Sequence, residues 1–238
     1  MIVTVDPVMI AVGAAATVAA AVIGSVYDFF RDRLLNRKKQ QIRELAERIA
    51  TDQICHYIDK DSMSGYDRKM ADETKVLTEK ILGEKPIEEL SEMNGEKRLV
   101  KINELVQNLA QLYQIELKEV AVGELNPRLA GCYDREKKVI VLNSVYLMNS
   151  DKQYLREFLD TIYHEFRHAV QFQVIENIDK LQDTEAANFW AVSRKRAARW
   201  CRHHQDYEEA VKNPLEYIMN NLEVDARTFA YMCLEGVE

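Results

Sequence analysis

The chain contains little glycine, proline or cysteine: 8, 4 and 4 of its 238 residues. Because glycine and proline break helices, their scarcity beside abundant Ala, Leu, Glu and Lys favours a mostly helical protein. The four cysteines are widely scattered without a C-x-x-C spacing, which argues against a disulfide framework and is typical of reduced thiols. An excess of basic residues is also missing, since the formal net charge is −7 at pH 7. We therefore expect no nucleic-acid partner.

Charge is absent from a long run near the N-terminus, Pro7 to Tyr27. As a helix this run would span about 31 Å, the thickness of one hydrocarbon core. Basic residues follow the run at Arg31, Arg33 and Arg37, whereas none precedes it. The positive-inside rule then predicts a single membrane-spanning helix within residues 1–27, with the rest of the protein in the cytoplasm. The alternative is an alanine-rich helix buried in a soluble cytoplasmic or exported protein.

Helical periodicity continues beyond the apolar run. Residues 28–96 are predicted to form a helical N-terminal region, either a stalk or a first layer of the following domain. Within and after this region the apolar spacing predicts helices at 28–60, about 70–82 and 97–113.

The spacing of apolar residues changes from helical to alternating after residue 113. Apolar and polar residues alternate from Ile115 to Val122, as in a half-buried strand. Gly131–Tyr133 and Lys138–Asn143 flank a polar turn and predict a hairpin. The segment from 97 to 238 is therefore expected to be an α+β domain, mostly helical, with a small antiparallel sheet.

The stretch His164-Glu165-Phe166-Arg167-His168 has the pattern H-E-x-x-H, inside a helix predicted from about Asp151 to Gln173. An apolar stripe opposite the histidines supports that helix: Leu155, Leu159, Ile162, Phe166 and Val170. Histidines four residues apart share one helix face, where both can bind one Zn²⁺ at about 2.0–2.1 Å while Glu165 acts as general base. The alternative is a pair of structural histidines beside an exposed glutamate.

A catalytic zinc site needs a third protein ligand. Acidic and histidine residues downstream supply the candidates: His203, His204, Asp206, Glu208, Glu209, Glu216, Glu223 and Asp225. Glu223 is favoured because Ala226 and Ala230 share its helical face, where small residues would let this helix approach the histidine helix closely. Asp225 points away from Glu223 on an ideal helix, which favours a cap or a salt bridge.

Together, the H-E-x-x-H motif, the later E-x-x-A-x-x-F-A around Glu223 and the strand ending at Asn143 resemble the compact gluzincin metallopeptidases of the ImmA/IrrE type. The resemblance covers roughly residues 97–236. It implies a zincin-like fold, a Zn²⁺ held by His164, His168 and Glu223, and Glu165 as general base. It also implies that the strand Lys138–Asn143 borders the cleft and pairs with an extended substrate.

Three further residues are candidates for catalytic or metal-binding roles, although their patterns are less specific. Tyr217 could donate its phenol O–H to the developing oxyanion, although an ordinary half-buried tyrosine explains it as well. His203 and His204 could form another metal site, or be solvated loop histidines.

A basic cluster begins at Arg194-Lys195-Arg196 and resumes at Arg199, between Trp190 and Trp200. It could contact acidic lipid or an acidic partner, but a solvated helix face with buried aromatics is the simpler interpretation.

These features predict a membrane-tethered zinc metalloendopeptidase that cleaves a protein substrate. Two alternatives remain: a secreted or delivered toxin or effector peptidase, and a zincin-fold binding protein without catalysis.

Overall fold

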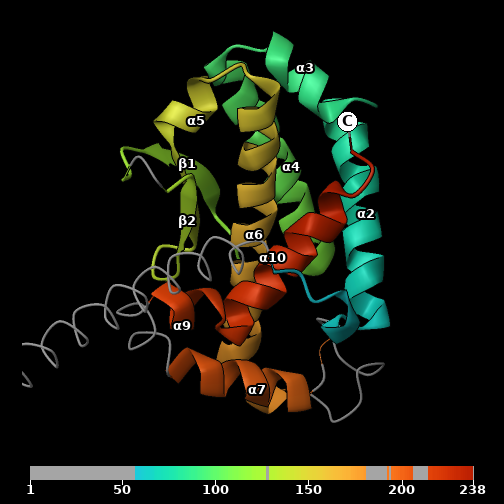
Figure 1. The fold of residues 1–238 in the computed structure, drawn as a ribbon, viewed down its shortest axis with the longest axis vertical. Coiled ribbons are helices and arrows are strands. Elements are labelled where there is room, and N and C mark those ends of the chain that lie inside the picture. Colours follow the sequence, from blue (N-terminus) through green and yellow to red (C-terminus); the bar gives the residue numbers. More distant parts are fainter. Residues whose placement is uncertain (1–56, 127–128, 181–191, 193, 206–213, 238) are drawn as a thin grey trace, which may run out of the picture. The chain divides into compact units, whose positions relative to one another are not determined.

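The computed structural model describes residues 57–126, 129–180, 192, 194–205 and 214–237. In chain order its elements are η1 (Lys60–Ser62), α2 (Gly65–Leu82), α3 (Pro86–Glu92), α4 (Gly95–Tyr113), β1 (Glu119–Gly123), β2 (Gly131–Asp134), β3 (Val139–Asn143), α5 (Ser144–Met148), α6 (Lys152–Glu176), η2 (Ile178–Lys180), α7 (Arg194–Gln205), α9 (Pro214–Ile218) and α10 (Asn221–Leu234). Helices dominate and the sheet is small (Figure 1), so the predicted α+β class is confirmed.

Local signals in the sequence explain where the helices begin and end. Ser64 and Asp67 form a reciprocal capping box at the start of α2, and Gly83 ends this helix with φ +103°. Asn94 caps α4 by accepting a hydrogen bond from the Lys97 N–H at 2.9 Å. Predicted helices at 70–82, 97–113 and 151–173 correspond to α2, α4 and α6 with small changes in their ends.

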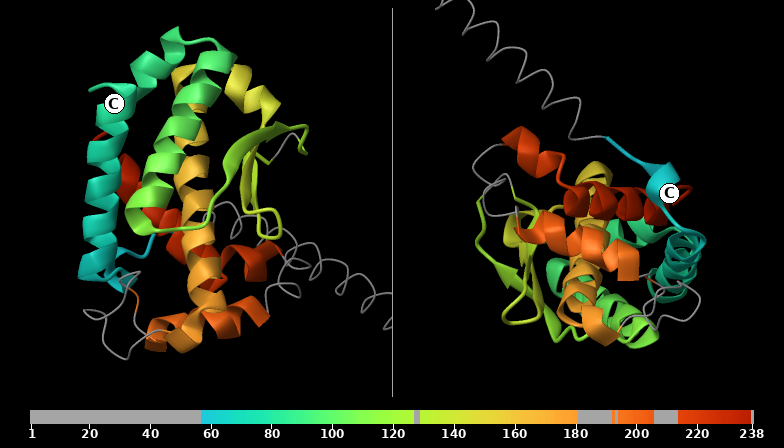
Figure 2. Two further views of the ribbon diagram at one scale, coloured as in Figure 1. Left: turned by 180° about the vertical axis from the view of Figure 1, so that it is seen from behind. Right: turned by 90° about the horizontal axis from the view of Figure 1, so that it is seen from below.

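Helix α6 lies at the centre of the described fold (Figures 1 and 2). Helix α10 crosses one of its sides, α4 lies on the opposite side, and the sheet and α2 flank it. The apolar core gathers around α6, whose residues Phe158, Ile162 and Phe166 are fully buried. Any side chain on α6 that faces α10 is therefore held in a rigid environment.

The sheet has the order β1-β3-β2, with β1 parallel and β2 antiparallel to β3. The predicted hairpin is thus confirmed, but the predicted antiparallel sheet is wrong because the sheet is mixed. Strands β1 and β2 pair with opposite edges of β3, so the strands that follow one another in the chain at β1 and β2 are not neighbours in the sheet. Strand β3 is buried at four of its five positions, which suits a central strand.

This order also overturns the substrate edge predicted at Lys138–Asn143. Both hydrogen-bonding edges of β3 are already paired, one with β1 and one with β2. A central strand has no edge to offer to an extended peptide. The strand predicted at 115–122 begins only at Glu119, because Ile115 N bonds to Ala110 O and Glu116 N to the Gln173 side chain.

The helix predicted within residues 1–27 lies outside the described residues, as does most of the helix predicted at 28–60. Among the helices that the structure describes, none combines the length and apolar character needed to cross a membrane. Residues 57–96, assigned to an N-terminal region, belong to the same compact unit as the residues from 97 on. Leu82, Ile87 and Leu90 are part of its core.

Candidate metal centre

Helix α6 carries the H-E-x-x-H residues. Its first turn is capped by Asp151, which accepts a hydrogen bond from the Gln153 N–H at 2.8 Å. All residues of the predicted apolar stripe are buried, which fixes the rotation of the helix about its axis. The two histidines consequently face α10.

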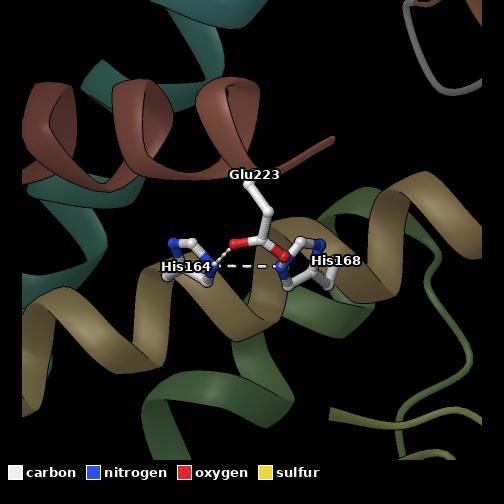
Figure 3. A group of neighbouring side chains, drawn as sticks. All are labelled: His164, His168 and Glu223. Carbon is white, nitrogen blue, oxygen red and sulfur yellow. Dashed lines mark hydrogen bonds and ion pairs between the residues drawn. The ribbon is translucent and has the colours of Figure 1, made fainter. Parts of the chain in front are cut away.

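Three side chains converge where α10 crosses α6 (Figure 3). The Nε2 atoms of His164 and His168 are 3.0 Å apart. Glu223 enters from the first turn of α10, with Oε2 at 3.2 Å from His164 Nε2 and Oε1 at 3.3 Å from His168 Nε2. Asn220 caps this turn by accepting a hydrogen bond from the Leu222 N–H at 2.9 Å, and so fixes the position of Glu223.

These separations suit one small divalent cation. Tetrahedral zinc with ligands at about 2.0–2.1 Å separates any two ligand atoms by roughly 3.3–3.4 Å. The two Nε2 atoms are 3.0 Å apart, and His164 and His168 lie 3.2 and 3.3 Å from different oxygens of Glu223. With one ligand atom taken from each residue, all three lie within 4.8 Å of one another. Two imidazoles and one carboxylate are also a common donor set for catalytic zinc, with a fourth position left for water. The residues present could therefore hold a divalent metal ion.

Small residues allow the two helices to approach. Ala226 and Ala230 of α10 are fully buried, as the sequence analysis expected for the packed face of this helix. The structure thus brings together the three residues predicted as ligands. Among the described residues, these three form the group of metal-binding side chains close enough to share one ion.

The protonation states of Glu223 and the two histidines depend on one another. Burial alone would raise the pKa of the Glu223 carboxyl, but the two imidazoles outweigh burial and hold this pKa well below its usual value. Burial would lower the pKa of His168, whereas the carboxylates of Glu223 and Glu165 and the Gln171 side chain raise it to about 9. A divalent cation would take the place of the proton on His168, and its binding would release that proton.

Glu165 is buried, and its carboxylate contributes to the raised pKa of His168. Burial and the nearby Glu165 carboxylate raise the pKa of the Cys132 thiol on β2. At Gly131 a Cβ atom would come within 2.9 Å of Thr161 Cγ2, so β2 lies closely against α6. Within the described sheet β2 pairs only with β3, so β2 is an edge strand that lies against α6.

Other third-ligand candidates lie elsewhere. Asp225 forms ion pairs with Arg167 and Arg196, which confirms the predicted salt bridge. Glu216 is exposed on α9. Asp206, Glu208 and Glu209 lie outside the described residues.

Tyr217 is half-buried on α9, and its catalytic role stays a prediction. His203 and His204 are half-buried near the end of α7, so the prediction that they lie in a loop is wrong. His204 Nε2 lies 2.8 Å from Arg135 Nη1, and the His204 ring packs edge-on against Phe172.

The basic segment forms helix α7. Trp200 is fully buried, as expected, and Trp190 lies outside the described residues. Arg194 and Arg199 are exposed, but Arg196 turns inward to Asp67 and Asp225. The predicted solvated face is therefore confirmed only in part.

Sequence reasoning missed one buried residue in contact with the site. Gln171 is fully buried and its Oε1 lies 2.8 Å from His168 Nδ1. Its position three residues after His168, on the same helix face, was the available signal.

Comparisons of the chain with protein-family models, curated proteins and solved structures found no match.

Proposed function

We propose that this chain is a zinc-dependent metallopeptidase that hydrolyses peptide bonds in a protein substrate. The observation that carries the proposal is the convergence of His164, His168 and Glu223 within 3.0–3.3 Å, from two helices that pack firmly together. This set agrees with the resemblance to ImmA/IrrE-type gluzincins, which is part of the proposal.

Each residue has a chemical role in this reaction. Zinc held by the three ligands would polarise the scissile carbonyl and lower the pKa of water to about 7. Glu165 is not one of the ligands, so its carboxylate can accept the proton of the attacking water. It then passes this proton to the leaving amine. Tyr217 remains a candidate donor to the oxyanion.

The outer edge of β2 is the best candidate for binding the substrate. It is an edge strand, it lies against α6, and Cys132 on it is near Glu165. An extended peptide paired with this edge would lie beside α6, the helix that carries Glu165 and the two histidines. This assignment replaces the edge expected at β3.

A membrane tether within residues 7–27 would restrict the enzyme to substrates near the membrane, as in a regulatory protease. Fractionation of a tagged protein tests this part separately from the chemistry. Recovery in the membrane fraction supports the tether, and recovery in the soluble fraction contradicts it.

The experiment that tests the peptidase is the substitution Glu165→Gln, which keeps the size of the side chain but cannot accept the proton. We expect zinc content and folding to be unchanged, while cleavage of a peptide library falls by about 10²–10⁴-fold. Glu157→Gln, an exposed change on the same helix, is the matched control and should cleave at the parental rate. Cleavage by Glu165→Gln at the parental rate would refute the role of Glu165. A zinc-loaded parent without cleavage would favour a binding protein.

A further inference from the structure

The metal-ligand candidate His168 contacts the protein through its second ring nitrogen as well. Nδ1 of His168 lies 2.8 Å from Oε1 of Gln171, and both side chains are buried. A histidine that binds a metal through Nε2 must carry a proton on Nδ1, and an acceptor at Nδ1 favours that tautomer.

The surroundings of Gln171 determine which way its amide points. The amide nitrogen Nε2 lies 3.0 Å from the Leu222 carbonyl oxygen and 2.8 Å from Asp225 Oδ2. Both neighbours accept hydrogen bonds, so a flipped amide would place its oxygen against two other oxygens. The amide oxygen must therefore face His168, and Nδ1 must donate to it.

Asp225 is itself held by buried charges. Arg167 Nε donates to Asp225 Oδ2 at 2.8 Å, and Arg196 of α7 pairs with Asp225 Oδ1. Both arginines also pair with Asp67 of α2. The acceptor that orients Gln171 is thus fixed by contacts from α6 and α7, and it cannot turn away without breaking ion pairs.

We propose that Gln171 is a positioning residue for His168: it fixes the Nδ1–H tautomer and the ring plane, and Asp225 fixes Gln171. This inference rests on the proposed metal site. The contacts of Gln171 with Leu222 and Asp225 also link the histidine helix α6 to α10, which carries Glu223. The same amide therefore helps to set the separation of the ligands.

Zinc affinity, measured by competition with a chromophoric chelator, tests the proposal. Gln171→Met keeps the volume but removes both the acceptor and the donor, and zinc affinity should fall about 10–100-fold. The matched control is Gln173→Met on the same helix. It also removes two hydrogen bonds, to Glu116 N and Gln114 O, but these partners lie in the connection between α4 and β1. Its zinc affinity should equal that of the parent.

The variant Gln171→Glu separates positioning from packing. Its carboxylate still accepts the Nδ1–H hydrogen bond, although its second oxygen faces the Leu222 carbonyl oxygen and Asp225 Oδ2 in place of the donating Nε2. Its zinc affinity should be closer to that of the parent than to that of Gln171→Met, even though the protein is less stable. Equal zinc affinity in Gln171→Met and Gln173→Met would overturn the proposal.

A measurement on the unmodified protein does not depend on the folding of any variant. In ¹⁵N-histidine spectra of the zinc-loaded protein, the proton of His168 should reside on Nδ1 and exchange slowly. A proton on Nε2, with zinc on Nδ1, would overturn the inference while leaving the peptidase proposal intact. A parent protein that binds no zinc would overturn both.

Discussion

Glu223 and His168 form a buried pair whose charge depends on pH. The pKa of His168 is raised to about 9 by the Glu223 carboxylate, against the opposing effect of burial. The pKa of Glu223 is lowered by the same contact, so the two shifts describe one interaction and do not add.

The pair predicts how the stability of the metal-free protein changes with pH. Because the pKa of His168 is higher in the folded than in the unfolded state, its contribution is complete below about pH 6.5 and is lost as pH rises through about 9. The loss should amount to about 3 kcal/mol in the free energy of unfolding, measured by urea unfolding with a chelator present.

His168→Gln is the control for this experiment, since it removes the titrating group. It should show a smaller loss of stability between pH 6.5 and 9 than the parent protein. The same pH dependence in both proteins would contradict the assigned interaction.

Four helices meet in one buried ion cluster beside the metal centre. Asp67 of α2 and Asp225 of α10 pair with Arg167 of α6 and Arg196 of α7. The Arg167 guanidinium also lies 5.3 Å from the Trp200 ring centroid and 5.1 Å from that of Phe229. The cluster fixes how α6 and α10 cross, and thereby the geometry of the ligands.

Removal of Arg167 should destabilise this junction. In Arg167→Met the buried carboxylates of Asp67 and Asp225 have only Arg196 as a partner. One negative charge is then uncompensated, which typically costs about 3–5 kcal/mol in the free energy of unfolding. Chemical unfolding should show this loss, whereas Arg68→Met on the exposed face of α2 should change stability by less than about 0.5 kcal/mol. A loss below 1 kcal/mol in Arg167→Met would mean that the cluster does not hold the helices together.

Across the whole molecule, local patterns predicted the helices better than the sheet. Helices α2, α4 and α6 follow from apolar spacing, since each buries one face. The order of the strands depends on which strands pair across the sheet, and no local pattern encodes that pairing. For this reason the antiparallel sheet and the substrate edge at Lys138–Asn143 were predicted wrongly.

In the candidate site, too, the features that depend on local spacing were predicted and those that depend on the packing of helices were not. The spacing of His164 and His168 is local, and Ala226 and Ala230 indicated the helix that brings Glu223 to them. The partners of Gln171 could not be predicted, because its contact with Asp225 exists only after α6 and α10 have packed.

The decisive experiment for the metal site is the zinc content of the purified protein after dialysis, determined by mass spectrometry. We expect one tightly bound zinc per chain in the parent and in Glu216→Gln, an exposed control. Glu223→Gln, which keeps the shape of the ligand but removes its charge, should lose most of the metal. A parent without zinc, or a Glu223→Gln protein that retains zinc as firmly as the parent, would contradict the account.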